Sequence, residues 1–478
     1  MANPLDVVIG AAEVALWLLL LGAAAHLARS GMWGWRRRVE APPRLADGAH
    51  PRVTVLLPIR NERYVVERTL RAACALSWPR AELEIRVLDD SDDDTSTLLD
   101  RVAAELRGEG APVAVLRRGD RRGFKAGALE QGLRATTGAY VCVLDADCIP
   151  PPDLLERLIP PLLADPRLGF TQARWDYENE RAGLLTRVQA LILDGLFLVE
   201  QSRQSALGRP VQFNGTCGVW RRAALEAAGG FWREGTDGPG PLTEDLELSA
   251  RAELAGYRGD ILPGVAVATE LPGRVASFRS QQKRWVAGAG QVLRDRWRRT
   301  GRAGALLHLL RHARQQLLVV ATLWLPATAL DWVRPFPSSA ATLGVWIATL
   351  SLLHLGLFLY YGAALRRRGR SPIPALGYAP LLVALSVGLC IALSAAYLGG
   401  VLGRGGEFVR TVKTGGGPDR GYRAPLDPLA FVEAAVGVAY VGVAGLAFAR
   451  GSVLAGAALL FWVAGGYLWI GLGSLVDR

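Results

Sequence analysis

The sequence predicts an α/β domain with a mostly parallel sheet, inserted between transmembrane helices that form an α-helical membrane region. Half of the 478 residues are hydrophobic and the mean hydropathy is +0.20, which is high for a soluble protein. Apolar runs long enough to cross a bilayer lie near the N-terminus and in the last third of the chain. Most acidic residues lie between them, where short apolar stretches alternate with stretches of helical spacing.

The first apolar run, residues 7–27, has about the length that a bilayer requires. Arginines and tryptophans follow it (Arg29, Trp33, Trp35, Arg36, Arg37, Arg38). Basic residues beside a span favour the cytoplasmic side, and tryptophans favour the membrane interface. We therefore expect a transmembrane helix over residues 1–30, a linker over 31–50 and a cytosolic domain over 51–275.

Four apolar segments in that domain predict strands, at residues 53–58, 83–88, 113–116 and 141–144. Helical spacing predicts helices at 67–76, over a stretch that ends near 107, and at 127–134. Because helices alternate with strands along the chain, neighbouring strands are expected to run parallel. The strand at 141–144 is apolar throughout, which is typical of the buried centre of a sheet.

The last third of the chain predicts a membrane region over 317–478, preceded by amphipathic interfacial helices over 276–316. Four of its apolar runs predict full spans: 317–332, 343–365, 431–448 and 453–476. A further run, 373–402, is apolar enough to span but is basic on both flanks, which opposes a single crossing. Its prolines and glycines favour a broken or re-entrant segment. We expect five spans plus this segment, with six spans as the alternative.

Charge and cysteine content indicate the compartment in which the protein lies. The formal net charge is +11, and the basic residues cluster beside the apolar runs, which favours cytoplasmic loops over a nucleic-acid-binding face. The five cysteines include no Cys-x-x-Cys pair, which argues against a zinc site or a disulfide framework. The sequence therefore predicts a multi-pass protein of the inner (plasma) membrane with a cytosolic domain and no nucleic-acid partner, and it indicates no oligomeric state.

Two carboxylates, Asp145 and Asp147, directly follow the central strand. Ligands of open α/β sheets bind beyond the carboxyl ends of the strands. Mg²⁺ commonly uses one or two carboxylates together with substrate phosphates, so this pair is a candidate metal and phosphate site. The alternative is a solvated turn at the end of the strand.

Polar residues also follow other predicted strands. Glu62 and Asp90 could hold a base or ribose through their carboxylates, although a capped strand-to-helix turn explains Glu62 equally well. Lys125, in a glycine-containing stretch, could meet a phosphate as a point charge, or it could simply begin a helix. Asn214, Gly215 and Thr216 form a small-residue turn that leaves room for a sugar ring, and an ordinary turn is the alternative.

Two further motifs precede the membrane region. Asp245 follows Thr243, so it could be a first-turn acid beside an N-cap, or a base that deprotonates a hydroxyl group. Gln281, Arg284 and Trp285 lie in an amphipathic stretch. An interfacial helix explains them, and the same residues could hold a phosphate and stack on a sugar.

Taken together, the motifs resemble those of processive family 2 glycosyltransferases in order and spacing: Asp89-Asp90, Asp145-x-Asp147, Thr243-Glu244-Asp245 and Gln281-x-x-Arg284-Trp285. The chain resembles the cellulose synthase superfamily, most of all its cellulose-synthase-like A (mannan/glucomannan synthase) branch and bacterial relatives. The resemblance covers about residues 50–300. Residues 408–413 also resemble the gating loop of bacterial cellulose synthase, with Arg410 in place of a valine.

The resemblance implies a GT-A domain and a role for each motif. Asp245 would be the catalytic base. Asp145 and Asp147 would bind Mg²⁺ or Mn²⁺ and the nucleotide diphosphate. The remaining donor-binding residues would be Glu62, Asp90, Lys125, Gln281, Arg284, Trp285, Thr411 and Lys413. The acceptor would contact Asn214, Gly215, Thr216, Glu244 and Trp285.

The implied reaction is an inverting transfer of a hexosyl unit from a nucleotide sugar, of the UDP-glucose or GDP-mannose type, to a growing polysaccharide. Membrane lipids would surround the enzyme, and export of the product could be coupled to synthesis. Two alternatives stay open. The enzyme could transfer one sugar to a membrane lipid, or the chain could be a non-catalytic transporter or scaffold.

Overall fold

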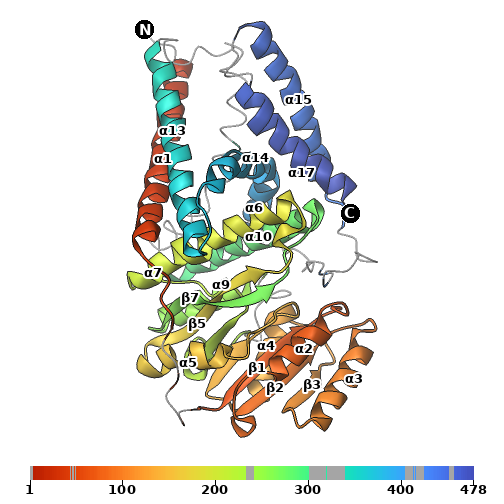
Figure 1. The fold of residues 1–478 in the computed structure, drawn as a ribbon. Coiled ribbons are helices and arrows are strands. Elements are labelled where there is room, and N and C mark those ends of the chain that lie inside the picture. Colours follow the sequence, from red (N-terminus) through yellow and green to blue (C-terminus); the bar gives the residue numbers. More distant parts are fainter. Residues whose placement is uncertain are drawn as a thin grey trace. The chain divides into compact units, whose positions relative to one another are not determined.

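The computed structural model describes residues 4–42, 45, 48, 50–232, 242–300, 319, 340–403, 413, 415, 425–451 and 457–477 (Figure 1). The chain forms two compact units. The sheet unit comprises Val39–Pro272 together with Gly405–Tyr422. The helical unit comprises Met1–Arg38, Gly273–Arg404 and Arg423–Arg478.

The sheet unit is built on one seven-stranded sheet with the order β3-β2-β1-β4-β6-β5-β7. Its strands are β1 (Val53–Ile59), β2 (Leu83–Asp89), β3 (Val113–Arg117), β4 (Tyr140–Val143), β5 (Leu168–Tyr177), β6 (Gly218–Arg221) and β7 (Arg258–Thr269). β6 runs antiparallel to both of its neighbours, and all other pairs are parallel. The mostly parallel sheet expected from the sequence is therefore present, and its first four strands lie where the apolar segments predict them.

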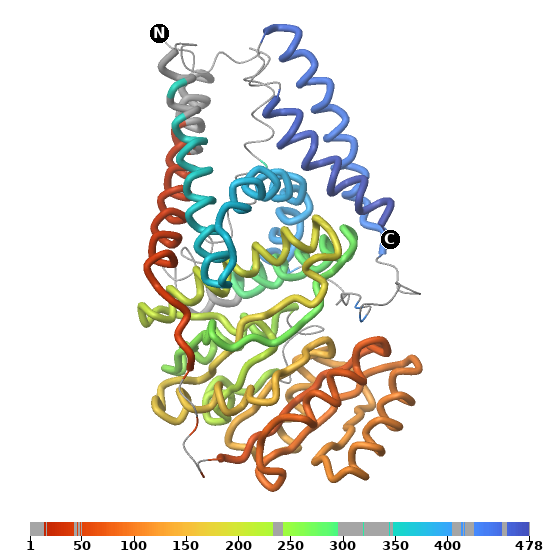
Figure 2. Tube along the Cα trace, in the orientation of Figure 1, coloured from red at the N-terminus to blue at the C-terminus, as the bar shows by residue number. Residues whose placement is uncertain are grey.

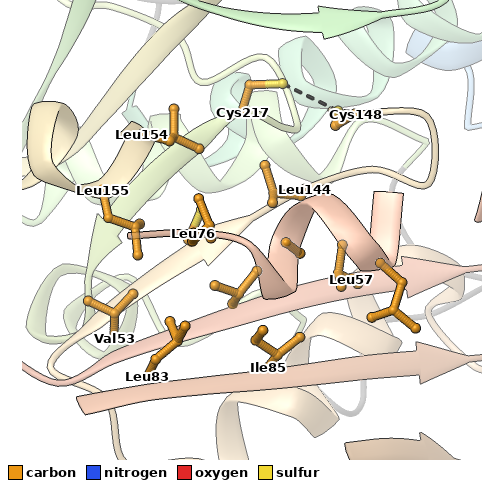
Figure 3. Packing of buried hydrophobic residues seen from close by; sticks show 14 of the residues in the cluster. Val53, Leu57, Leu76, Leu83, Ile85, Leu144, Cys148, Leu154, Leu155 and Cys217 are labelled. Carbon is orange, nitrogen blue, oxygen red and sulfur yellow. Dashed lines mark hydrogen bonds between the residues drawn. The ribbon is translucent and has the colours of Figure 1, made fainter. Parts of the chain in front are cut away.

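Helices cover both faces of the sheet, and the alternation of side chains along each strand assigns the contacts. Val53, Val55 and Leu57 of β1 join a core with one set of helices, α2 (Val66–Cys74), α3 (Thr95–Gly108) and α5 (Leu154–Ala164). Leu56, on the other face, joins a core with α4 (Phe124–Arg134), α8 (Arg222–Ala227) and α9 (Glu244–Leu254). Figure 3 shows part of the first core.

The remaining helices of the sheet unit follow β5, and they are α6 (Leu184–Asp194), a π-helical turn (Gly195–Gln201) and α7 (Ser202–Ala206). Short 3-10 turns lie at Arg80–Glu82 and Glu180–Ala182. α5 contacts β5, β6 and β7. The central strand β4 contributes Cys142 to the first core and Val141 and Val143 to the second. The central strand is thus held by helices on both faces, and its end is a fixed point.

The helical unit contains α1 (Pro4–Arg36), α10 (Val275–Thr300), α13 (Ala340–Arg367), α14 (Pro374–Val401), α15 (Leu429–Ala449) and α17 (Gly465–Val476), with a π-helical turn at Leu459–Ala464 before α17. In the described part of the chain, four stretches are long and apolar enough to cross a membrane: Ala348–Arg367, Pro374–Val401, Leu429–Ala449 and Leu459–Val476. The predicted span at 317–332 lies outside the described residues, apart from Val319.

The N-terminal helix extends further than the sequence predicts. α1 includes the apolar run 7–27 but continues to Arg36, into the stretch expected to be a linker. α1 and α13 lie side by side (Figures 1 and 2). The indole of Trp35 donates a 2.8 Å hydrogen bond to the main-chain oxygen of Leu359 in α13, and Gly31 meets the same backbone without a side chain between them. These contacts explain why the helix does not end at residue 30.

The break expected in segment 373–402 is wrong. α14 is one continuous helix from Pro374 to Val401. Pro374 occupies the first turn, where its missing N–H costs nothing. The glycine predicted to interrupt the helix serves close packing instead, since a Cβ atom at Gly388 would lie 2.7 Å from Ile470 and would meet the backbone of Gly466. The helix is long and apolar enough to cross a membrane, which favours the six-span alternative.

Candidate active site

The loop after β4 is the centre of the candidate site. The main-chain N–H of Asp145 donates a 2.7 Å hydrogen bond to the hydroxyl of Thr216, which precedes β6. The carboxylate of Asp147 accepts a 3.0 Å hydrogen bond from the main chain of Glu270, which follows β7. Because the partners come from separate strands of one rigid sheet, the two carboxylates are held at its carboxyl edge, where ligands of such sheets bind.

Lys125 brings four of the predicted site residues together. Its ammonium lies 2.6 Å from Asp145 and 3.3 Å from Glu244, and it donates a 2.9 Å hydrogen bond to the main-chain oxygen of Gly215. Asp245 is also close, because a Cβ atom at Gly215 would lie 3.0 Å from its Oδ2. Four segments thus meet around the ammonium of Lys125: α4 itself, the loop after β4, the loop before β6 and the start of α9.

The carboxylates around this point keep Lys125 charged. Burial raises the pKa of Asp145, and the nearby carboxylates add to that effect, while Lys125 opposes it. Burial lowers the pKa of Lys125, but Asp145 and Glu244 outweigh it, so the pKa of this lysine lies above its ordinary value. Lys125 therefore keeps its proton, and the site holds a fixed positive charge among three carboxylates.

A second lysine reaches the other carboxylate. Lys413 donates a 2.8 Å hydrogen bond to Asp147 and also contacts the main-chain oxygen of Glu270. Burial would raise the pKa of Asp147, but Lys413 and the main chain of Glu270 hold it below its ordinary value. The pKa of Lys413 is raised, because Asp147, Glu270 and Glu62 outweigh its burial. Glu62 is thus placed near Asp147 and Lys413.

Asp90 lies at the end of β2 and is paired with Arg118, which the sequence analysis did not select. The guanidinium donates to both carboxylate oxygens, at 2.7 and 2.5 Å, and also to the main-chain oxygen of Phe124, at 2.7 Å. Arg118 therefore connects the predicted base-binding carboxylate to the first residue of α4, which precedes Lys125. The sequence could have pointed to Arg118, because it directly follows the predicted strand β3. The carboxyl end of β3 lies at the same edge of the sheet as that of β2.

Gln172, in β5, is a second residue that sequence reasoning missed. Its side-chain oxygen accepts hydrogen bonds from the main-chain N–H and the side-chain amide of Asn214, at 3.0 and 3.2 Å. Its amide donates a 3.0 Å hydrogen bond to the main-chain oxygen of Thr216. Gln172 is fully buried, so one side chain holds both ends of the predicted acceptor turn and leaves Gly215 between them. Gln172 was missed because it lies in β5, a strand that the sequence analysis did not predict.

The predicted acceptor residues have structural contacts of their own. The side chain of Asn214 donates a 2.9 Å hydrogen bond to Gln201, and that of Thr216 accepts the bond from Asp145. Thr243 stands at the N-cap position of α9, as expected, but its side chain makes no capping bond, and Asp245 caps its own following N–H at 2.8 Å. An acceptor contact by Asn214 or Thr216 stays a prediction.

Comparison with known proteins identifies the family to which the residues of this site belong. A family model described as "Glycosyltransferase like family 2" matches residues 50–288, half of the chain. The chain belongs to this family. The matched range contains the predicted motifs from Glu62 to Trp285.

Two relatives from Arabidopsis thaliana illustrate the likeness. "Probable glucomannan 4-beta-mannosyltransferase 11" is 40% identical over 256 residues, which cover 52% of this chain and 56% of that protein. "Glucomannan 4-beta-mannosyltransferase 7" is 34% identical over 336 residues, which cover 65% of this chain and 59% of that protein. The chain spans about half the length of the curated relatives it matches. The predicted likeness to the cellulose-synthase-like A branch is confirmed.

A solved structure confirms the fold class. The mannosyltransferase of Pyrobaculum calidifontis, determined in complex with GDP-Man and Mn²⁺, aligns with a TM-score of 0.54 at 23% identity. The alignment covers 75% of this chain and 99% of that one. This family 2 glycosyltransferase therefore has a GT-A-like sheet domain, as the sequence predicts.

The carboxylate pair of this family 2 glycosyltransferase fits a divalent cation that is completed by phosphate. Among the described residues, no group of three or more His, Cys, Asp or Glu side chains could hold a metal without other ligands. Asp145 and Asp147 are hard oxygen donors, and each already attracts a cationic side chain, Lys125 or Lys413. Mg²⁺ and similar ions bind in this way through one or two carboxylates plus phosphate oxygens and water.

Gln281, Arg284 and Trp285 lie on α10, in the helical unit. α10 is a single helix across the start of the predicted segment 276–316, and its interfacial position stays a prediction. Thr411 lies outside the described residues, although Lys413 of the same motif is described. The structure therefore gathers Lys125, Asp145, Asp147, Glu244 and Asp245 within the sheet unit and places the Gln-x-x-Arg-Trp motif on a helix of the other unit.

Proposed function

We propose that the chain is a membrane-embedded, inverting β-glycosyltransferase that transfers hexosyl units from a nucleotide sugar to a growing polysaccharide. The single observation that supports this best is the arrangement around Gly215. There Lys125 contacts Asp145 and Glu244, and Asp245 lies within reach of the same glycine. A candidate cation-binding carboxylate and a candidate base close to the same glycine are what a single displacement at a sugar carbon requires.

Asp245 is the proposed base. In an inverting displacement, the acceptor hydroxyl attacks the anomeric carbon while the bond to the diphosphate breaks. A carboxylate is a weak base toward an alcohol, so proton transfer to Asp245 accompanies the breaking of that bond. Glu244, which is buried beside Lys125, would orient the acceptor.

The leaving diphosphate is assigned to the carboxylate pair and its lysines. A Mg²⁺ or Mn²⁺ ion held by Asp145 and Asp147 would neutralise charge on the diphosphate as it departs. Lys125 and Lys413 now contact these carboxylates, and both keep their protons. They are therefore placed to turn to phosphate oxygens when the donor binds. Thr411, Arg284 and Gln281 are proposed to complete this enclosure.

Asp90 and Glu62 are proposed to bind the base and ribose of the donor. Arg118 contacts both oxygens of Asp90, but a carboxylate offers about four acceptor positions, so N–H groups of a base can bind beside the guanidinium. The names of the curated relatives support a mannosyl donor, which makes the GDP-mannose type the first donor to test and the UDP-glucose type the second.

Location and acceptor belong to the same proposal. Four helices suited to crossing a membrane support a membrane protein, and the basic residues beside the apolar runs support a cytosolic position for the sheet unit at the plasma membrane. A glycan chain is the proposed acceptor, with Trp285, Asn214, Gly215 and Thr216 as contacts, and export of the product is a further part of this proposal. The alternative acceptor is a membrane lipid.

The deciding experiment is incubation of the purified full-length protein with radiolabelled nucleotide sugars, followed by sizing of the product. A ladder or high polymer supports a polysaccharide synthase. A single product soluble in organic solvent supports the lipid alternative. No incorporation from any nucleotide sugar, in a preparation that unfolds cooperatively on heating, contradicts the enzymatic assignment.

A further inference from the structure

A buried cluster of charges lies at one end of α10 and belongs wholly to the helical unit. Arg279 is 2% exposed, and its guanidinium lies 3.1 Å from Glu433 and 3.3 Å from Asp427. Lys283, one turn further along α10, also contacts Asp427. Two positive groups of α10 therefore meet two negative groups at and just before the start of α15.

Glu433 makes this cluster unusual. It lies in α15, one of the helices able to cross a membrane, and it is fully buried. Its second carboxylate oxygen accepts a 3.2 Å hydrogen bond from the main-chain N–H of Ala392 in α14. A charged side chain in a membrane helix is costly to bury, so such residues commonly mark function. Through Glu433, the cluster joins α10 to two membrane helices.

α10 is held at a second point on the same face. Ala287 and Gly290 follow Arg279 and Lys283 at helical spacing, on one side of the helix. There α10 crosses α14 without side chains in between. A Cβ atom at Gly290 would lie 2.9 Å from the main-chain nitrogen of Val401, and one at Gly400 would meet the backbone of Ala287. A rotation of α10 would therefore break the ionic contacts and create clashes at this crossing.

The residues of the Gln-x-x-Arg-Trp motif lie on the other side of this helix. At about 100° per residue, Gln281, Arg284 and Trp285 project between about 140° and 240° from Arg279. The face that packs on α14 and pairs with Asp427 and Glu433 thus determines the direction of the face that bears the motif.

We propose that Arg279 and Glu433 are positioning residues. Their buried ion pair sets the rotation of α10 so that Trp285 can hold the acceptor and Gln281 and Arg284 the diphosphate. This inference rests on the proposed function, because it assigns the motif to the binding of acceptor and donor. An ion pair suits the task, since it is satisfied at one relative placement of two helices, whereas apolar packing tolerates several. It also connects acceptor binding to the membrane helices through which a polymer would pass.

The test is a double-mutant cycle with Arg279→Met, Glu433→Gln and the combined variant. Each single change leaves a buried charge without its partner, so thermal stability is expected to fall in both. The combined variant has no unpaired charge and should recover most of that loss. Additive losses in melting temperature would contradict the ion pair, whether or not the preparation is active. Because the combined variant is expected to fold, the test survives if a single variant does not.

Kinetics separates positioning from a merely structural role. In the combined variant we expect the KM of the acceptor and the KM of the donor both to rise, because Trp285 is assigned to the acceptor and Gln281 and Arg284 to the diphosphate. Transfer should fall on the order of 100-fold. Arg450→Met, which removes an exposed arginine in the turn after α15, is the matched control and should leave both constants unchanged. A combined variant with a normal acceptor KM and normal transfer overturns the proposal. Failure of the proposed function itself appears differently, as absence of transfer in the parent protein.

Discussion

The ammonium of Lys413 donates a 2.8 Å hydrogen bond to the carboxylate of Asp147, although 266 residues separate them in the sequence. The motif that resembles a gating loop therefore reaches the carboxylate pair of the sheet domain. Because Lys413 holds the pKa of Asp147 below its ordinary value, the two groups form a charged pair at the proposed diphosphate site.

Lys413→Met should raise the donor KM, because the diphosphate would lose one of its positive contacts. We expect a loss of at least about tenfold in kcat/KM, since hydrogen bonds to charged groups contribute about 1.5–3 kcal/mol. Titration of donor binding, together with initial rates, provides the measurement. Lys413→Arg keeps the charge and serves as the control. Equal donor affinity in Lys413→Met and the parent protein would contradict this role.

Asp245→Asn should abolish transfer, with an expected loss of about 10²- to 10⁴-fold in kcat, because the amide cannot accept the proton of the acceptor hydroxyl. Binding of the nucleotide diphosphate, measured by calorimetry, should stay nearly unchanged. Glu247→Gln, two residues further along the same helix, is the matched control and should keep its activity. Normal turnover by Asp245→Asn would remove this residue as the base.

Gln172→Leu should separate the support of the acceptor turn from general packing. The change leaves the main-chain groups of Asn214 and Thr216 without their partner, which costs about 1–3 kcal/mol of unfolding free energy. We expect kcat to fall as well, because Gly215 would no longer be held beside Asp245. Denaturant unfolding and initial rates are the two measurements.

Gln189→Leu is the matched control for that change. Gln189 is also a buried glutamine that donates to a main-chain oxygen, that of Pro272, at 2.9 Å. It should lose comparable stability while keeping kcat. A similar loss of kcat in both variants would mean that Gln172 acts through stability alone.

Gly215→Ala should inactivate the enzyme. Gly215 has φ +84°, and an added Cβ atom would lie 3.0 Å from Asp245 and 3.5 Å from the ammonium of Lys125. Gly208→Ala provides the comparison, because Gly208 has φ +61° with nothing within 4 Å of the added atom. Both variants should lose about 1–2 kcal/mol from the left-handed backbone. Only Gly215→Ala should also lose transfer. Retained activity in Gly215→Ala would contradict the close approach of Asp245 and Lys125 to this glycine.

Removal of divalent cations with a chelator should stop transfer, and Mn²⁺ or Mg²⁺ should restore it. Asp145→Asn should require a higher metal concentration for half-maximal activity, because one of two oxygen donors is weakened. The control is Asp153→Asn, which removes an acid at the start of α5, in the same unit. Full activity in the presence of excess chelator would contradict a metal at this carboxylate pair.

The first half of the sheet could be predicted because its strands are buried on both faces. β1 and β4 are therefore nearly continuous apolar runs. β2 alternates charged and apolar residues over its first half, which is a strand pattern of its own. β5, β6 and β7 escaped prediction for opposite reasons. β5 mixes polar residues such as Gln172 into the strand, β6 has four residues, and β7 contains Pro263. Their pairing depends on partners that are distant in the chain.

The candidate site was likewise predictable only in part. Asp90, Asp145 and Asp147 could be selected because each directly follows a predicted strand, and strand ends meet at one edge of a parallel sheet. Arg118 follows a predicted strand in the same way and could have been selected. Glu270 and Gln172 could not, because they lie at or beyond strands that the sequence did not reveal, and their importance comes from contacts with the site.

Local patterns in the amino-acid sequence were enough for the fold class, the membrane runs and the identity of the carboxylates, because burial and strand ends leave a signature within a few residues. Tertiary structure alone decided which groups face one another: Lys413 with Asp147, Gln172 behind the acceptor turn, and Arg279 with Glu433. These contacts join residues far apart in the chain. Their energies depend on distances of a few ångströms, and only the folded backbone sets those distances.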